Sequence, residues 1–154
     1  MKMYLVQHAK AKSEEEDPDR PLSQTGQEDI RDTAAAAASL GLDVEKILHS
    51  GKLRAEQTAE ALQEQLSPPQ GVDVHSGLGP VDDVQPVAEE LDTSAQSMML
   101  VGHLPFMERL TGLLAAGDED LPVVAFQNGA VVCLQKADVR WQISWILTPE
   151  MSRL

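Results

Sequence analysis

The sequence has little of what secreted, membrane-spanning or nucleic-acid-binding proteins need. Cys133 is the only cysteine, so an internal disulfide cannot form, and the apolar run around it indicates a buried thiol. No apolar stretch approaches the ~18 residues that cross a bilayer, and the amino terminus shows no signal-peptide pattern. The chain holds 12 lysines and arginines against 25 acidic residues, a net charge of −13, which disfavours nucleic acid and anionic membranes as partners. We therefore expect a soluble, cytoplasmic protein.

Several familiar catalytic signatures are also missing. The chain contains no phosphate-binding P-loop, no dinucleotide-binding Gly-x-Gly-x-x-Gly, no Gly-x-Ser-x-Gly nucleophile elbow and no Cys-x-x-Cys. Neither a His-x-x-x-His pair nor an acidic triad supports a metal site. We therefore expect no metal ion and no cofactor.

Short apolar runs alternate with helical periodicity along most of the chain. This alternation is typical of strands joined by crossover helices, and the length suits one domain covering residues 1–154. We predict an α/β fold, a three-layer α/β/α sandwich around a mostly parallel sheet. The expected strands are 3–6, 44–48, 72–74 and 98–101, and the expected helices are 28–40, 53–66, 84–91 and 105–114.

The last part of the chain predicts strands without helices between them. Apolar residues alternate with other residues in the final run, which should place Trp141 and Trp145 on one face. We expect these strands to join the sheet in antiparallel orientation. They are 123–126, 129–134 and 141–147, with Gln127-Asn128-Gly129 as a turn.

Two histidines and an arginine follow three of the predicted parallel strands. His8 and His103 each end an apolar strand, and Arg54 opens the helix that follows a third. The carboxyl ends of parallel strands meet at one edge of a sheet, where ligands bind. Neutral imidazole is a nucleophile, and a guanidinium near a helix N-terminus can bind phosphate oxygens as a bidentate fork. The three side chains therefore predict chemistry on a phosphoryl group, whereas His49 and His75 lack supporting motifs and should be structural or surface residues.

Two features near this expected site have open interpretations. The acidic, proline-bounded run at 14–21 is either a solvated loop or a rim over the site with Arg20 turned inward. Asp82 and Asp83 follow a loop that is suitably located for a general acid, and a solvated helix N-terminus explains them equally well. We take Asp83 as the candidate acid.

The motifs around these residues form a specific set. They are Gln7-His8-Ala9, Arg20-Pro21-Leu22-Ser23 leading to Gly26, Ser50-Gly51-Lys52-Leu53-Arg54-Ala55-Glu56-Gln57-Thr58, and Val101-Gly102-His103-Leu104-Pro105. On these motifs the whole chain resembles the histidine phosphatase superfamily and, within it, the short SixA-like phosphohistidine phosphatases. The resemblance implies a phosphoglycerate mutase-like fold. It also implies that His8 becomes transiently phosphorylated, that Arg54 and His103 bind and neutralise the phosphoryl group, and that Arg20 contributes to the pocket.

One position departs from the family pattern. The family has Arg-His-Gly where this chain has Gln7-His8-Ala9. Glutamine can still donate a hydrogen bond to substrate, but it lacks the charge and the fork of arginine. Because a hydrogen bond to a charged group contributes about 1.5–3 kcal/mol, we expect a loss of tenfold or more in rate or affinity. Lys10, Lys12 or Lys52 could restore part of the charge.

The resemblance implies a metal-independent phosphatase that removes phosphate from phosphohistidine on a signalling or phosphotransfer protein. The sequence shows no clear general acid. This agrees with a phosphohistidine substrate, because a protonated imidazole leaves readily from phosphorus. Two alternatives stay open at this point. One is a phosphatase of small phosphate esters, and the other is a phosphoprotein-binding pseudophosphatase in which Gln7 accompanies a loss of turnover.

Overall fold

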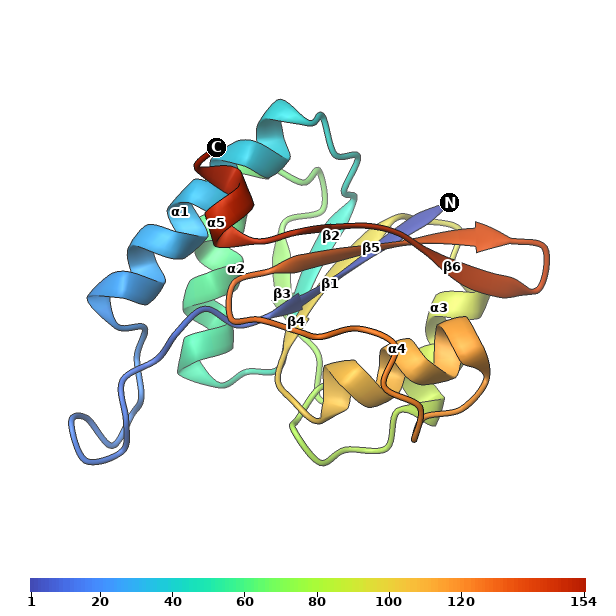
Figure 1. The fold of residues 1–154 in the computed structure, drawn as a ribbon, viewed down its shortest axis with the longest axis horizontal. Helices are drawn as coiled ribbons and strands as arrows, with labels where there is room; N and C mark the ends of the chain where they lie inside the picture. The colour runs from blue at the N-terminus through green and yellow to red at the C-terminus, as the bar shows by residue number, and fades with distance from the viewer.

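One six-stranded sheet runs through the computed structural model, which describes residues 1–154 (Figure 1). The sheet order is β3-β2-β4-β1-β5-β6, in which β3, β2, β4 and β1 are mutually parallel and β5 is antiparallel to both β1 and β6. The predicted α/β class with late antiparallel strands is therefore confirmed. The strands are β1 (Lys2–Gln7), β2 (Lys46–His49), β3 (Val72–Val74), β4 (Met98–Gly102), β5 (Val131–Ala137) and β6 (Arg140–Leu147).

Five helices cover the two faces of the sheet. α1, α2 and α5 lie on one side and α3 and α4 on the other (Figure 1). The chain moves from β1 to β2 and β3 in one direction and then turns back to β4, so right-handed crossovers place the later helices on the opposite face. The helices are α1 (Gln24–Ser39), α2 (Leu53–Leu66), α3 (Gln85–Thr93), α4 (Phe106–Ala116) and α5 (Pro149–Ser152).

The central strand β1 is buried on both faces. Met3 and Leu5 belong to the core cluster on the side of α3 and α4, whereas Tyr4 and Val6 belong to the cluster on the side of α1 and α2. Each of these four side chains is at most 2% exposed. Burial on both faces explains why this run is apolar throughout and does not alternate with polar residues.

The predicted strand at 123–126 is wrong. The segment has no strand partner, and Val124 is buried against the core on the α3–α4 side, with Val123 and Phe126 packed beside it. Its apolar pattern therefore reflects packing of an irregular segment and not pairing in the sheet. A turn at Asn128-Gly129 follows as expected, but it leads into β5 and does not close a hairpin.

The prediction that the two tryptophans share a face is also wrong. The β5–β6 register shifts between Cys133 and Leu134, which leaves Ser144 of β6 as an extra residue. An extra residue of this kind changes which face of the sheet the following side chains point to. Trp141 consequently joins the core on the α3–α4 side, while Trp145 packs on the α1–α2 side.

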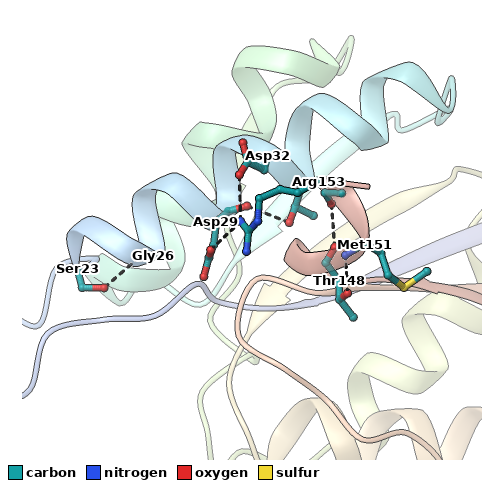
Figure 2. A network of polar contacts seen from close by, with 9 residues as sticks. Ser23, Gly26, Asp29, Asp32, Thr148, Met151 and Arg153 are labelled. Atoms are coloured by element: carbon teal, nitrogen blue, oxygen red, sulfur yellow. Dashed lines mark hydrogen bonds and ion pairs between the residues drawn. The ribbon is translucent and has the colours of Figure 1, made fainter.

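The last helix, α5, was not predicted from the sequence. Thr148 caps it by accepting a hydrogen bond from the Met151 N–H at 3.2 Å. Just beyond it, Arg153 Nη1 lies 3.0 Å from Asp29 Oδ1 and 3.0 Å from Asp32 Oδ2 on α1 (Figure 2). These ion pairs fasten the end of the chain to the first helix.

Helix α1 begins earlier than predicted, directly after Ser23. The Ser23 hydroxyl caps the helix by accepting a hydrogen bond from the Gly26 N–H at 3.0 Å (Figure 2). A Cβ on Gly26 would lie only 2.0 Å from the Lys10 carbonyl oxygen, so only glycine permits this approach. The first turn of α1 therefore packs directly against the loop that follows β1.

Candidate active site

The candidate site lies at the carboxyl edge of three adjacent parallel strands. β4 is placed between β1 and β2, and Gln7 at the end of β1 is in register with Gly102 at the end of β4. His8 and His103 therefore leave the sheet side by side, with ring centroids 4.9 Å apart and planes tilted by 54°. The structure thus brings together the two histidines that the sequence singled out.

The backbone around His8 is held from three directions. The His8 N–H donates to the Gly102 carbonyl at 2.9 Å, the Asn128 side-chain amide donates to the His8 carbonyl at 2.9 Å, and the Ala9 N–H donates to Thr58 Oγ1 at 3.0 Å. The His8 side chain is only 8% exposed. Because the loop is fixed by β4, α2 and the segment before β5, the position of the imidazole is also fixed.

The hydrogen bonding of the His8 ring determines which nitrogen is free. Nδ1 lies 2.7 Å from the Ala9 carbonyl oxygen, which can only accept, so Nδ1 carries the proton. Nε2 is then the unprotonated nitrogen with a lone pair. Fixing the tautomer through a backbone carbonyl is a common way to orient a reactive imidazole.

Both histidines are neutral at ordinary pH. Burial lowers the pKa of His8 to about 4; the hydrogen bond to Ala9 opposes this lowering, and Arg54 and Arg20 add to it. Burial likewise lowers the pKa of His103 to about 3, followed by the effects of His8, Arg54, Lys52 and Arg20. An unprotonated His8 is the form required of a nucleophile.

These lowered pKa values predict a pH dependence that can be measured without substrate. His8 should titrate near pH 4 in an NMR titration of the imidazole resonances. Because the unfolded chain binds a proton near pH 6.5, folding stability should decrease as pH falls from 6.5 towards 4. Urea unfolding at several pH values checks this, and His8→Ala should weaken the trend. A His8 pKa near 6.5 would contradict the burial argument.

Arg54 lies in the first turn of α2. Its side chain is half-buried, and its Nε is buried without a hydrogen-bond partner in the protein. Burial lowers the pKa of Arg54, Arg20 lowers it further, and Glu14 opposes them. A guanidinium is so strong a base that the group still carries its charge at neutral pH. The Thr58 hydroxyl donates to the Arg54 carbonyl at 2.8 Å, which ties this turn to the loop of His8.

An open cleft of about 540 Å³ lies beside Arg54. Three cations line it, Arg20, Lys52 and Arg54, and Glu14 and Asp19 stand on the opposing acidic segment. Arg20 has a positive φ of 50°, and its Nε donates to the Lys12 carbonyl at 3.0 Å. This placement agrees with the interpretation of the acidic run as a rim with Arg20 turned inward. Its loop projects from the body of the molecule (Figure 1).

A larger hollow lies away from the histidines. It measures about 690 Å³ and is lined mainly by apolar residues, among them Tyr4, Leu40, Trp145 and Met151. Lys2 is the only side-chain cation among its lining residues. The smaller cleft, which is lined by three cations, is therefore the better suited of the two to an anion, although neither His8 nor His103 is among its lining residues.

The two remaining predicted site residues are placed differently. Gln7 is half-buried at the end of β1, next to His8, and its Oε1 is buried without a partner. Asp83 is exposed, and its carboxylate accepts a hydrogen bond from the Gln85 N–H at 3.0 Å. No hydrogen bond or ion pair joins Asp83 to the histidine pair, so its role as a general acid stays a prediction.

Four residues of the site had no role assigned from sequence. Ser50 Oγ lies 2.6 Å from His103 Nε2, and Gln57 Oε1 accepts a hydrogen bond from the Leu22 N–H at 2.8 Å. Thr58 and Asn128 hold the His8 loop. Gln57 and Thr58 stand in the Leu-Arg-Ala-Glu-Gln-Thr string, so their motif was visible although their contacts were not.

The other two histidines make local contacts, as expected. His49 is buried, and its Nδ1 accepts a hydrogen bond from the Gly51 N–H at 3.0 Å. His75 Nε2 pairs with Glu90 at 2.8 Å on the neighbouring helix α3. Across the chain, no group of three or more His, Cys, Asp and Glu side chains is arranged to hold a metal ion. None of the helices has the length and apolar character needed to cross a bilayer.

This fold and its two facing histidines define a histidine phosphatase. The family model of the histidine phosphatase superfamily (branch 1) matches residues 3–82, and the chain belongs to this superfamily. Within it the chain is SixA-like: phosphohistidine phosphatase SixA of Escherichia coli (strain K12) is 29% identical over 152 residues, covering 94% of each chain.

Solved structures agree with this assignment. The protein histidine phosphatase SixA in complex with tungstate superposes with a TM-score of 0.85 at 26% identity, covering 97% of each chain. A mycobacterial glucosyl-3-phosphoglycerate phosphatase in complex with VO3 shares the fold at a TM-score of 0.71 and 16% identity, covering 94% of this chain and 98% of that one. The chain therefore shares the fold of these phosphatases, and its family membership and its likeness to SixA support phosphatase activity.

Proposed function

We propose that this phosphatase removes phosphate from phosphohistidine on a signalling or phosphotransfer protein, through a covalent intermediate on His8 and without a metal ion. The observation that carries the proposal is the buried His8 ring, whose Nδ1 is bound to the Ala9 carbonyl so that Nε2 is free to attack. The two SixA relatives, which are named for phosphohistidine or protein histidine phosphatase activity, support this substrate class.

The reaction divides into two transfers. In the first, His8 Nε2 forms a bond to phosphorus in line with the P–N bond that breaks, and the substrate imidazole, which is protonated on its other nitrogen, departs as a neutral molecule with the P–N electron pair on its released nitrogen. In the second, water attacks phosphorus, the bond to Nε2 breaks, and orthophosphate leaves. Arg54 neutralises the oxygens of the transferring group in both transfers, and His103 donates to them.

The first transfer needs only modest acid assistance. An imidazole that is protonated on its other nitrogen leaves phosphorus as a neutral molecule, whereas an alkoxide from an ester needs a proton at once. The exposed position of Asp83 agrees with a phosphohistidine substrate, whose leaving group needs little help from an acid. Asp83 remains our candidate for the proton donor on esters, and Asp83→Asn should therefore impair ester hydrolysis more than phosphohistidine hydrolysis.

The direct test is incubation with a phosphohistidine-bearing phosphotransfer protein in the presence of EDTA. We expect orthophosphate release and an acid-labile phosphate on the enzyme. Faster turnover of p-nitrophenyl phosphate than of the phosphoprotein would favour small esters as substrates. Tight binding of the phosphoprotein without release or label would identify a binding module. Loss of activity in EDTA that added Mg²⁺ or Zn²⁺ restores would contradict the metal-independent mechanism.

Gln7→Arg should raise phosphatase activity about tenfold. Arginine would add a charge and a bidentate fork beside the nucleophile, and a hydrogen bond to a charged group contributes about 1.5–3 kcal/mol. The measurement is kcat/KM for orthophosphate release, with Gln27→Arg on the exposed face of α1 as a matched control for added charge. Unchanged or lower activity would show that the pocket is adapted to glutamine.

A further inference from the structure

Ser50 makes a contact with His103 that connects two separate loops of the site. It follows β2, while His103 follows β4, and Ser50 Oγ lies 2.6 Å from His103 Nε2. The Lys52 N–H donates to the same Ser50 oxygen at 3.3 Å. The other ring nitrogen of His103, Nδ1, is buried and has no partner in the protein. His103 itself is only 2% exposed.

The position of one proton on His103 decides what its ring can do. At neutral pH the ring is uncharged, because burial and the neighbouring cations hold its pKa near 3. A neutral imidazole has one N–H donor and one acceptor nitrogen. Phosphoryl oxygens only accept, so Nδ1 can bind them only when it carries the proton. With the proton on Nε2, the lone pair of Nδ1 would repel the same oxygens.

We propose that Ser50 is a positioning residue that donates its hydroxyl proton to His103 Nε2 and thereby keeps the ring proton on Nδ1. This inference rests on the proposed phosphoryl transfer to His8, whose ring packs 4.9 Å from that of His103. With Nε2 engaged by Ser50, Nδ1 is the ring nitrogen that remains to donate to a phosphoryl group on His8. Ser50 acts through His103 and does not itself touch the phosphoryl group.

The contacts of Ser50 favour this direction of donation. Its oxygen already accepts the Lys52 N–H at the entry to α2. The hydroxyl proton of Ser50 has no acceptor in the protein other than His103 Nε2. The Lys52 N–H and the Ser50 hydroxyl then each have an acceptor, and the Nδ1–H of His103 is left as the donor for a bound phosphoryl oxygen.

The test reads the tautomer of His103 directly by ¹⁵N NMR of the histidine-labelled, full-length protein at pH 7.5. The wild type should show a protonated Nδ1 and an unprotonated Nε2. Ser50→Ala should move a substantial part of the population to the Nε2-protonated form, and Ser50→Thr should restore the wild-type pattern because it keeps the hydroxyl. A wild-type proton on Nε2, or an unchanged tautomer in Ser50→Ala, would overturn the proposal.

A second readout connects the proton to anion binding. Orthovanadate affinity should fall about three- to tenfold in Ser50→Ala, as expected for one lost hydrogen bond, and recover in Ser50→Thr. Ser39→Ala on the exposed side of α1 is the matched control. A shifted tautomer with unchanged vanadate affinity would contradict the role of Nδ1. Both readouts use the resting protein, so a lack of phosphohistidine hydrolysis would refute the proposed substrate and leave this test intact.

Discussion

His8→Ala should lower orthophosphate release by at least about a thousandfold and abolish the acid-labile phosphate on the enzyme. The variant loses the only imidazole with a free, unprotonated nitrogen facing the site. His103 cannot replace it, because its Nε2 is engaged by Ser50. The fold should persist, since the loop at residue 8 is held by backbone hydrogen bonds to Gly102 and from Asn128 that alanine also makes.

Two comparisons make this result specific. His75→Ala removes a histidine that pairs with Glu90 outside the site, and it should retain wild-type turnover. Urea unfolding of His8→Ala should show a cooperative transition like that of the wild type. Orthophosphate release by a folded His8→Ala variant at the wild-type rate would contradict covalent catalysis on His8 and require another nucleophile.

Arg54→Ala should lower kcat/KM by about 10²–10³-fold, the range for removing one preorganised donor from a developing anion. Among the cations, its guanidinium has the largest lowering effect on the pKa of both histidines, and its half-buried position strengthens its effect on a phosphoryl group. The backbone hydrogen bond from Thr58 to the residue 54 carbonyl does not depend on this side chain. The substitution should therefore affect chemistry more than folding.

Arg54→Lys separates charge from geometry. Lysine keeps the cation but loses the planar fork, so its activity should fall between those of the wild type and Arg54→Ala. Arg31→Ala removes an exposed arginine of α1 and should leave kcat/KM unchanged. Equal activity of Arg54→Ala and Arg31→Ala would show that the cleft cations do not bind the transferring group.

Much of the fold could be predicted, because its strands and helices follow from the local pattern of apolar residues. The runs at 3–6 and 98–101 are apolar throughout, as central parallel strands must be, and the structure places them side by side as β1 and β4. Apolar residues at helical spacing correctly predicted that α2 begins at Leu53 and ends at Leu66. Parallel strands ending at one edge were sufficient to predict that His8 and His103 meet.

Three of the failures involve contacts between distant segments. The apolar pattern at 123–126 cannot distinguish a strand from an irregular segment that covers a core. The bulge at Ser144 is determined by the pairing of β6 with β5, so the alternation around Trp145 was misleading. The contact between Ser50 and His103 joins residues on different loops, and only the three-dimensional structure reveals it.

β1 comes before the other five strands in the sequence, but its two partners in the sheet come late. It pairs with β4 on one side and β5 on the other, and β4 separates it from β2. During translation its apolar run therefore lacks its first partner until β4 (Met98–Gly102) has been made and its second until β5 (Val131–Ala137) has been made. A nascent chain stopped before β5 would present a free edge on the very strand that precedes His8, and such edges template aggregation. His8, which follows β1, thus depends for its position on β4 and β5, two strands that come much later in the sequence.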